Sequence, residues 1–475
     1  MSLAIRLRAF LRTREGRAFA IVVVAGLVLR LGWGLWSMRE VPSSLSDQFS
    51  YWYYGNEMAH FRGYISYNVI AGGNSIAVQS TGMATSYYPL GWPALLGVVY
   101  WLGLHTCVPD DQAKLTAVTQ ALLSTGSVAL VYFVARKSFN HRIGIIAGVI
   151  VALFPSLIAS VGTYSIETPF IFFMLVSIAI VVDHDWASGP MSTGRLVWFG
   201  IALGWSAMVR PFSLPIVLGL IVAVWCGGRD RSPDWKQNWR RSWKQLARHL
   251  GWTVLVLGVV LTPWTIRNAV TFHKLIPFSN NLGDTMCLSR FIGSDGGFAW
   301  SDHAGCADPS LPEAVRNPAN TKAAIQFVLD HPREELRQIP LRLRLMMNND
   351  HSVFGEVELN GSHVTFGADA RSALYLSADW YFRAVWLLAL GGVGLLFRGW
   401  RRDPLQGPRR ALIAIPALCL LLIPIGLWGT PRFHIPLLPY LAIAAAASLS
   451  WMIDRWRSAT APRVFDPADR VCSFD

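Results

Sequence analysis

The apolar run AFAIVVVAGLVLRLGWGLWS, residues 18–37, decides the fold class of this chain. It has the length of about 20 residues that a helix needs to cross the hydrocarbon core of a bilayer, and Arg30 is its single charge. Comparable runs follow at 113–135, 143–161, 168–182, 250–266, 380–397, 411–428 and 435–452. The chain is therefore predicted to be an all-α polytopic membrane protein, with its first run retained as a signal anchor.

The composition agrees with a membrane protein and argues against a nucleic-acid partner. Hydrophobic residues make up 53% of the 475 residues and charged residues 15%, whereas soluble domains carry about 25% charged residues. The net charge of +13 comes largely from short Arg and Lys clusters beside apolar runs, as in segments 6–17, 136–142, 229–248 and 398–410. Such clusters are typical of cytoplasmic loops that follow the positive-inside rule.

Two regions leave the number of crossings open. Residues 88–104 either span the membrane or lie at its outer surface, and residues 195–226 form either one long helix or two short helices divided at Arg210 and Pro211. If 88–104 spans, the parity of crossings makes 195–226 a single helix with Arg210 in its middle, at a cost of about 3 kcal/mol. We prefer the other arrangement, which has about ten transmembrane helices, both chain ends cytoplasmic and the 136–142 cluster inside.

This topology places two large segments outside the cell membrane, at 38–112 and 267–379. The second is too long and too polar for a simple connection, and we expect it to be a small folded cap. The chain then divides into an N-terminal transmembrane module at 1–266, the cap at 267–379, and C-terminal helices with a tail at 380–475. The expected location is the plasma (inner) membrane.

Ionisable residues recur at the ends of the predicted helices that face outward. They are Asp47 and Glu57 in the first loop, Glu167, Arg210, Arg267, Arg432 and His434. Arginine forks bind phosphate through paired, charge-assisted hydrogen bonds, and a nearby carboxylate can take a proton from a hydroxyl. The set therefore favours group transfer from a lipid phosphate, with Asp47 and Glu167 as catalytic candidates and the cations Arg210, Arg267, Arg432 and His434 as ligands of the donor phosphate.

Each of these residues also has a purely structural interpretation. Glu167 could stabilise a helix start through the helix dipole, and Asp47 could be a helix cap or a solvated loop residue. Arg267 could anchor the interface beside Trp264, and His434 could be a satisfied interfacial histidine. The aromatic residues of the first loop need no function at a membrane interface either.

Several stretches, in their order and their positions relative to the helices, carry a resemblance to a known family. They are SDQFSYWYYGNEMAHFRGY (46–64), YYPLGWPALLG (87–97), ALFPSLIASVGTYSIETPF (152–170), AMVRPFSL (207–214), PWTIRN (263–268), IPFSNNLG (276–283) and PRFHIPLLPYL (431–441). With them the chain resembles the polytopic glycosyltransferases of the C superfamily. Within that superfamily it is similar to bacterial relatives of protein O-mannosyltransferases and of aminoarabinose transferases acting on lipid A.

The resemblance implies transfer of a sugar from a polyprenyl-phosphate donor to an acceptor hydroxyl at the extracytoplasmic surface. The acceptor would be a glycan, a lipid or a protein. Asp47 takes the role of the base, Arg210 and Arg267 would hold the donor phosphate, and Glu167 would line the cavity. Many relatives pair two acids in the first loop, where this chain has Gln48 after Asp47, and this departure argues against a metal site or a second carboxylate in the loop. A divalent cation stays an open cofactor. We expect the loop's aromatic residues to lie in the headgroup layer and to stack on sugar or lipid.

Two further predictions concern cysteine chemistry and the competing functions. Cys287 and Cys306 close a short glycine-rich loop in the predicted cap and are the expected disulfide, with Cys107 as the third cysteine outside. A transporter or lipid flippase remains an alternative, as does an assembly partner without catalysis. No P-loop motif is present, in keeping with an activated lipid donor, and the cysteine and histidine spacings do not indicate a metal site.

Overall fold

The structure, a computed structural model, describes residues 8–42, 46–72, 75–106, 111–186, 188–227, 235–299, 305–308, 310–359, 365–397, 403 and 405–460. Helices dominate these residues, and a single two-stranded antiparallel hairpin accompanies them within the described part. In chain order the elements are α2 (Arg14–Ser37), α3 (Asp47–Ala59), β1 (Ile65–Gly72), β2 (Ser75–Ala84), α4 (Gly91–His105), α5 (Gln112–Ser138), α6 (His141–Ala152), α7 (Pro155–Ala159), η1 (Ser160–Gly162), α8 (Glu167–Val182), α9 (Thr193–Val209), η2 (Pro211–Ser213), α10 (Ile216–Gly227), α11 (Trp235–Phe272), α12 (Leu282–Cys287), α13 (Glu313–Asp330), α14 (Pro332–Met346), α15 (Ser352–Leu359), α16 (Ala368–Phe397), α17 (Gln406–Leu421), α18 (Ile423–Gly426), η4 (Pro431–Phe433), η5 (Ile435–Leu437) and α19 (Leu438–Thr460).

The all-α polytopic fold class is confirmed. Six helical stretches of the described residues are long and apolar enough to cross a membrane, at Arg14–Ser37, Gln112–Ser138, Ser242–Phe272, Ala368–Phe397, Gln406–Gly426 and Pro431–Thr460. The bent pair His141–Ala152 and Pro155–Gly162 would add a seventh, and shorter apolar helices lie at Glu167–Val182 and Pro211–Gly227. The total of ten transmembrane helices therefore stays a prediction.

Region 195–226 forms two helices, α9 and α10, which are divided at Arg210 and η2 as the preferred topology requires. The break follows from the sequence, because Pro211 lacks an N–H and restricts the residue before it to extended backbone. Arg210 accordingly has φ −155° and ψ 123°. Region 88–104 becomes α4, which packs against α3 and is too short to be counted as a candidate span.

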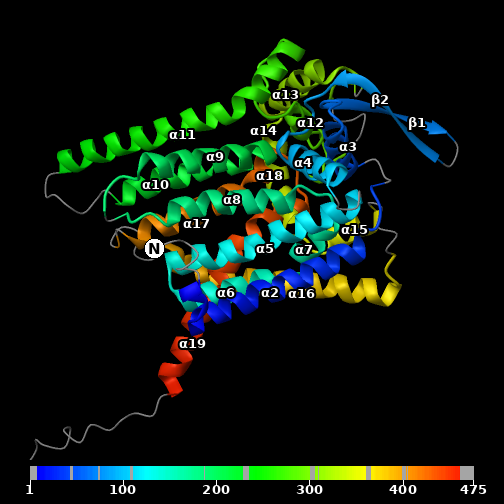
Figure 1. Cartoon of the computed structure of the whole chain (residues 1–475). Coiled ribbons are helices and arrows are strands. Elements are labelled where there is room, and N and C mark those ends of the chain that lie inside the picture. Colours follow the sequence, from blue (N-terminus) through cyan, green and yellow to red (C-terminus); the bar gives the residue numbers. More distant parts are fainter. Residues whose placement is uncertain are drawn as a thin grey trace, which may run out of the picture.

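The helices run between two ends of the bundle, and the N-terminal helix α2 starts at the end opposite to the hairpin and α12–α15 (Figure 1). We call the end at which α2 starts the basic end. Its contacts join distant segments: Arg136 to Glu15, Lys137 and Arg195 to Asp183, Arg142 to Asp454, and Arg409 to the carbonyl of Val182. The 136–142 cluster thus lies at the same end as the start of α2, in agreement with the preferred topology, and Asp183 is compensated by basic partners there.

A buried arginine stabilises the break between α6 and α7. Pro155 has no N–H to give to the carbonyl of Val151, so the last carbonyls of α6 need other donors. Arg30 supplies them: its Nη2 donates to Val151 O and its Nη1 to Ala152 O, each at 2.9 Å, while its Nε donates to Ser124 Oγ at 2.7 Å. This side chain is 0% exposed, so its role is to hold α2 and α5 against the break.

We expect Arg30→Met to lower the thermal stability of the detergent-solubilised protein, because buried carbonyls left without donors cost about 1–3 kcal/mol each. A fluorescence melting curve of purified protein measures the change. Arg39→Met is the matched control, since Arg39 lies exposed just beyond the same helix and its Nε donates to Trp36 O. Equal melting temperatures for the two variants would contradict the structural role of Arg30.

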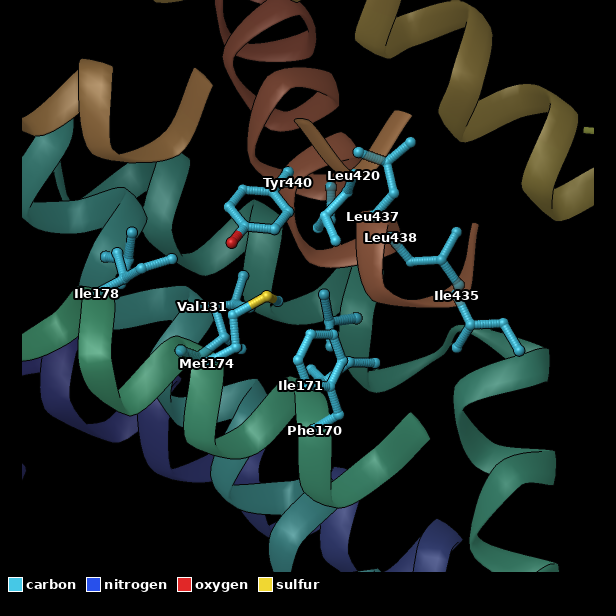
Figure 2. Close-up of a cluster of buried hydrophobic side chains, with 14 of the residues drawn as sticks. Val131, Phe170, Ile171, Met174, Ile178, Leu420, Ile435, Leu437, Leu438 and Tyr440 are labelled. Carbon is cyan, nitrogen blue, oxygen red and sulfur yellow. The ribbon is translucent and has the colours of Figure 1, made fainter. Parts of the chain in front are cut away.

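A dense apolar core fixes the start of α8 against the segment before α19. Figure 2 shows side chains of this core, and the labelled residues are Val131, Phe170, Ile171, Met174, Ile178, Leu420, Ile435, Leu437, Leu438 and Tyr440. All of them are at most 3% exposed, and Val131, Phe170, Ile178 and Leu438 are fully buried. The core holds the first residue of α8, Glu167, close to η4 and hence to Arg432.

A disulfide bond closes a loop within the predicted cap. The predicted disulfide between Cys287 and Cys306 is confirmed, with Cα atoms 5.9 Å apart. Cys107 lies outside the described residues. Helix α11 continues to Phe272 and α16 begins at Ala368, so the helices that flank the predicted cap extend beyond the boundaries expected at 266 and 380.

Candidate active site

A cavity of about 610 Å³ lies at the end of the bundle opposite to the basic end. Its walls come from α3 and the segment after β2, from the start of α8, from the break between α9 and α10, from α12, and from the segment that leads into α19. These segments are far apart in the sequence, and several of them are helix ends. The cavity therefore gathers the polar groups that helix ends carry.

Asp47 stands at the first position of α3 and lines this cavity. Its carboxylate is 39% exposed and has two partners: Tyr88 donates its hydroxyl to Oδ1 at 2.5 Å, and Arg432 Nη1 lies 3.0 Å from Oδ2. Burial, reinforced by the charge of Asp47, raises the pKa of Tyr88 well above its usual value. Tyr88 therefore keeps its proton and acts as a fixed donor that orients the Asp47 carboxylate.

Arg432 is the central cation of the cavity. Besides Asp47, its guanidinium contacts Glu167 Oε1, with Nη2 at 3.1 Å and Nε at 3.2 Å, and Nε lies 3.4 Å from Glu356 Oε1. Three carboxylates from three parts of the chain thus converge on one guanidinium. The geometry is available because a guanidinium carries five N–H donors spread over three nitrogens, whereas the three donors of an ammonium group share a single nitrogen.

Glu167 connects Arg432 with a second arginine. Its side chain is 2% exposed, and Oε1 accepts a hydrogen bond from Arg210 Nη1 at 3.3 Å. The Arg210 guanidinium also lies over the rings of Phe212 and Phe433 and lines the cavity. Within the described residues Nη1 is the only guanidinium nitrogen of Arg210 with a hydrogen-bond partner, so the remaining side-chain N–H groups are available to a ligand.

Glu356 on α15 is a site residue that the sequence did not reveal. Its Oε2 accepts from Gln48 Nε2 at 3.2 Å and from Ser165 Oγ at 3.1 Å. Burial raises the pKa of this carboxyl, as do Glu167 and Asp47, while Arg432 opposes the shift. Gln48, which follows Asp47, thus bonds to a carboxyl contributed by the cap segment. The spacing of Glu356 from the other acids gives no signal in the sequence.

The residues matched by a known family model lie within the bundle. Residues 99–276 match the family described as dolichyl-phosphate-mannose-protein mannosyltransferase. No curated protein matches the chain by sequence.

Solved structures match over nearly the whole chain. The oligosaccharyltransferase of Archaeoglobus fulgidus, tethered to an acceptor peptide containing the NVT sequon, is 13% identical with a TM-score of 0.54, over 97% of this chain and 52% of that one. The same archaeal enzyme, AglB, in complex with an inhibitory peptide and a dolichol-phosphate, is 14% identical with a TM-score of 0.53, over 95% and 51%. ArnT from Cupriavidus metallidurans bound to undecaprenyl phosphate reaches a TM-score of 0.42 at 15% identity, over 92% and 78%.

The chain has the fold of the C-superfamily (GT-C) glycosyltransferases. It spans about half the length of the archaeal oligosaccharyltransferase that it matches. Its GT-C fold brings four of the predicted site residues together around one cavity: Asp47, Glu167, Arg210 and Arg432.

Arg267 does not join them around the cavity. Its guanidinium donates to Thr85 O at 2.7 Å, to Tyr64 O at 2.8 Å and to Asn268 Oδ1 at 2.8 Å, and it packs over Trp264. Arg267 thus binds the backbone on both sides of the hairpin. It therefore fixes the segment that contains the hairpin instead of lining the cavity with Arg210.

His434 also lies away from the cavity. It is 0% exposed, and its ring stacks on Phe382 with centroids 4.5 Å apart. Its Nδ1 contacts Met346 O at 2.6 Å and its Nε2 contacts Asp350 Oδ1 at 2.9 Å. His434 thus anchors the segment that carries Arg432 to the cap, and the structure gives it no place beside a bound phosphate.

Three aromatic residues of α3 form a core, contrary to the expectation that the aromatic stretch lies in the headgroup layer, whereas Tyr51 of the same helix lines the cavity. Phe49, Tyr53 and Tyr54 are at most 7% exposed and pack with Tyr64 and Trp264. The reason is that the hairpin and α11 cover the face of α3 on which they stand. The aromatic stretch therefore positions Asp47 by packing, and it does not offer these rings to a ligand.

The carboxylates around the cavity outnumber the arginines that contact them. The three carboxylates, Asp47, Glu167 and Glu356, face two arginines, which leaves one negative charge when all five groups are ionised. Among the described residues no group of three or more His, Cys, Asp or Glu side chains could hold a metal ion. Of the three carboxylates, Asp47 is the most exposed and thus the one that a substrate reaches most easily.

Proposed function

We propose that this chain is a glycosyltransferase that moves a sugar from a polyprenyl-phosphate donor to an acceptor hydroxyl at the extracytoplasmic membrane face. The observation that carries the proposal is the convergence of Asp47, Arg210 and Arg432 on one cavity at the end of the bundle opposite to the basic end. A carboxylate that can take a proton and arginines that can hold a phosphate are the two components that this reaction needs.

In the proposed step, the acceptor oxygen attacks the anomeric carbon and its proton passes to the Asp47 carboxylate. The bond between the anomeric carbon and the phosphate oxygen breaks, and polyprenyl phosphate leaves with both electrons of that bond. Arg210 is the phosphate ligand with free N–H groups, and Arg432 stabilises the charge that grows on the phosphate. Since the pKa of Glu356 is raised, this carboxyl can take up a proton and reduce the negative charge around the phosphate.

Fold relatives support the choice of a lipid phosphate. The matched archaeal oligosaccharyltransferase was solved with a dolichol-phosphate, and the family model that matches residues 99–276 is named for dolichyl-phosphate-mannose. A transporter would require ionisable groups that face a passage in the middle of the membrane. The buried charge of α2, Arg30, is instead fully engaged with Ser124 and backbone carbonyls. We therefore favour the enzyme.

Arg210→Ala is expected to weaken binding of dolichyl phosphate by about ten- to a hundredfold, because it removes charge-assisted hydrogen bonds to the phosphate. Binding is measured by titration of full-length protein in nanodiscs. Arg195→Ala is the control, since Arg195 pairs with Asp183 at the basic end. If both variants bind dolichyl phosphate as tightly as the wild type, Arg210 is not the phosphate ligand.

A further inference from the structure

The cavity wall carries a second tyrosine–carboxylate pair beside the first. Tyr87 donates its hydroxyl to Asp284 Oδ2 at 2.9 Å, just as its neighbour Tyr88 donates to Asp47 at 2.5 Å. The two rings meet edge to face with centroids 5.0 Å apart, and all four residues line the same cavity. One dipeptide thus links two polar poles of the cavity, one at Asp47 and one at Asp284.

The Asp284 pole is rigid. Asp284 is 4% exposed and accepts hydrogen bonds from Asn320 Nδ2 at 2.7 Å and from Arg316, whose Nη2 lies 2.9 Å from Oδ2. It stands on the short helix α12, which the disulfide at Cys287 ties down one turn further on. A carboxylate fixed in this way provides a defined geometry for a ligand at little further entropic cost.

The chemistry of this pole suits hydroxyl groups better than phosphate. Arg316, which compensates the charge of Asp284, lies against the Tyr87 ring, and the described lining of the cavity does not include it. The lining here offers the Tyr87 hydroxyl, Asp284, and the neutral side chains of Asn281 and Thr285. Such groups donate to and accept from hydroxyls, whereas the guanidinium that would bind a phosphate, Arg316, is paired with Asp284 and does not line the cavity.

Aromatic side chains complete the pole. Phe278, three residues before Asn281, lines the cavity, and Trp428 meets Phe298 edge to face with centroids 4.8 Å apart. A sugar ring has hydroxyls at its rim and C–H groups on its faces, so it matches a wall that combines aromatic rings with a few convergent polar groups.

We propose that Tyr87 and Asp284 form a subsite for the hydroxyl groups of a sugar ring, on the donor or on a glycan acceptor, and that this subsite contributes to the choice of sugar. The proposal rests on the proposed transferase function and deepens it. The subsite adds a specificity element to a cavity in which Asp47 takes the proton and the arginines hold the phosphate.

The test compares Tyr87→Phe and Asp284→Asn with the wild type, in full-length protein in nanodiscs. The donor arm measures affinity for dolichyl phosphate and for dolichyl phosphates that bear mannose, glucose or galactose. The acceptor arm measures affinity for methyl glycosides of the same sugars. If the subsite reads the donor sugar, Tyr87→Phe reduces the preference for the sugar-bearing lipid about tenfold and leaves binding of bare dolichyl phosphate unchanged. If it reads the acceptor, affinity for the methyl glycosides falls instead.

Tyr100→Phe is the matched control, because Tyr100 is buried in α4 and bonds to Thr116 outside the cavity lining. Its melting temperature shows what the loss of a buried phenol hydroxyl costs. The subsite is overturned if both Tyr87→Phe and Asp284→Asn keep every sugar affinity within about twofold of the wild type. A wild type that binds methyl glycosides through Tyr87 but does not bind dolichyl phosphate would instead overturn the proposed donor.

Discussion

Exchange of Asp47 for asparagine is expected to reduce sugar transfer by about 10²- to 10⁴-fold, because an amide cannot take up the proton of the acceptor hydroxyl. Asparagine has nearly the same shape as aspartate, and its oxygen still accepts the Tyr88 hydroxyl that now reaches Oδ1. The ion pair with Arg432 is lost, but Asp47 is 39% exposed and such pairs contribute only about 0–1 kcal/mol. Expression and melting temperature should therefore stay close to those of the wild type.

The assay follows transfer from radiolabelled polyprenyl-phosphate sugar in membranes that contain the full-length protein. Glu57→Gln is the matched control, because Glu57 lies on the same helix α3 and pairs with Arg62 away from the cavity lining. We expect this variant to retain transfer. If Asp47→Asn transfers sugar at the wild-type rate, Asp47 is not the base, and Glu356 becomes the next carboxylate to test.

The residues that the sequence could identify are those whose place follows from a helix end. Asp47 begins α3, Glu167 begins α8, and Arg210 ends α9 before a proline. Counting crossings therefore put them at one end of the bundle, which the structure shows. The disulfide of Cys287 and Cys306 was predictable for a similar reason, because a short loop keeps two cysteines close.

The roles of Arg267 and Glu356 could not be predicted from the sequence, because their partners lie far away along the chain. Nothing in PWTIRN shows that Arg267 is engaged with the carbonyls of Thr85 and Tyr64, about 200 residues away along the chain. Glu356 enters the site because α15 packs beside α7 and η4, a contact between distant segments. Local sequence patterns indicate where helices begin and end, whereas contacts between distant segments depend on tertiary packing.

Removal of the Arg432 charge is expected to affect both stability and activity. In Arg432→Met, Glu167 keeps only Arg210 as a cationic partner. Asp47 and Glu356 lose their contact with the Arg432 guanidinium, so the negative charges of the site are less well compensated. Loss of one partner from a buried ion pair typically costs about 3–5 kcal/mol. We expect a clearly lower melting temperature and no detectable sugar transfer. Arg432→Lys should be intermediate, because one ammonium group cannot contact three carboxylates at the distances that the guanidinium spans.

A second substitution separates the two effects. If Arg432→Met destabilises through unpaired charge, Arg432→Met combined with Glu167→Gln should regain much of the melting temperature while transfer stays absent, since Gln removes a buried charge without supplying a cation.

Lower pH should also reduce the loss of stability in Arg432→Met. The pKa of Glu356 is already raised, first by burial, and loss of Arg432 removes an interaction that opposes this shift. A carboxyl whose folded-state pKa is raised stabilises the fold when protonated, and that stability is lost as pH rises through the folded-state pKa. The gap in melting temperature between Arg432→Met and the wild type should therefore shrink from about pH 8 to about pH 5. A gap that stays constant over this range, with no recovery in the double variant, would show that Arg432 acts through packing and not through its charge.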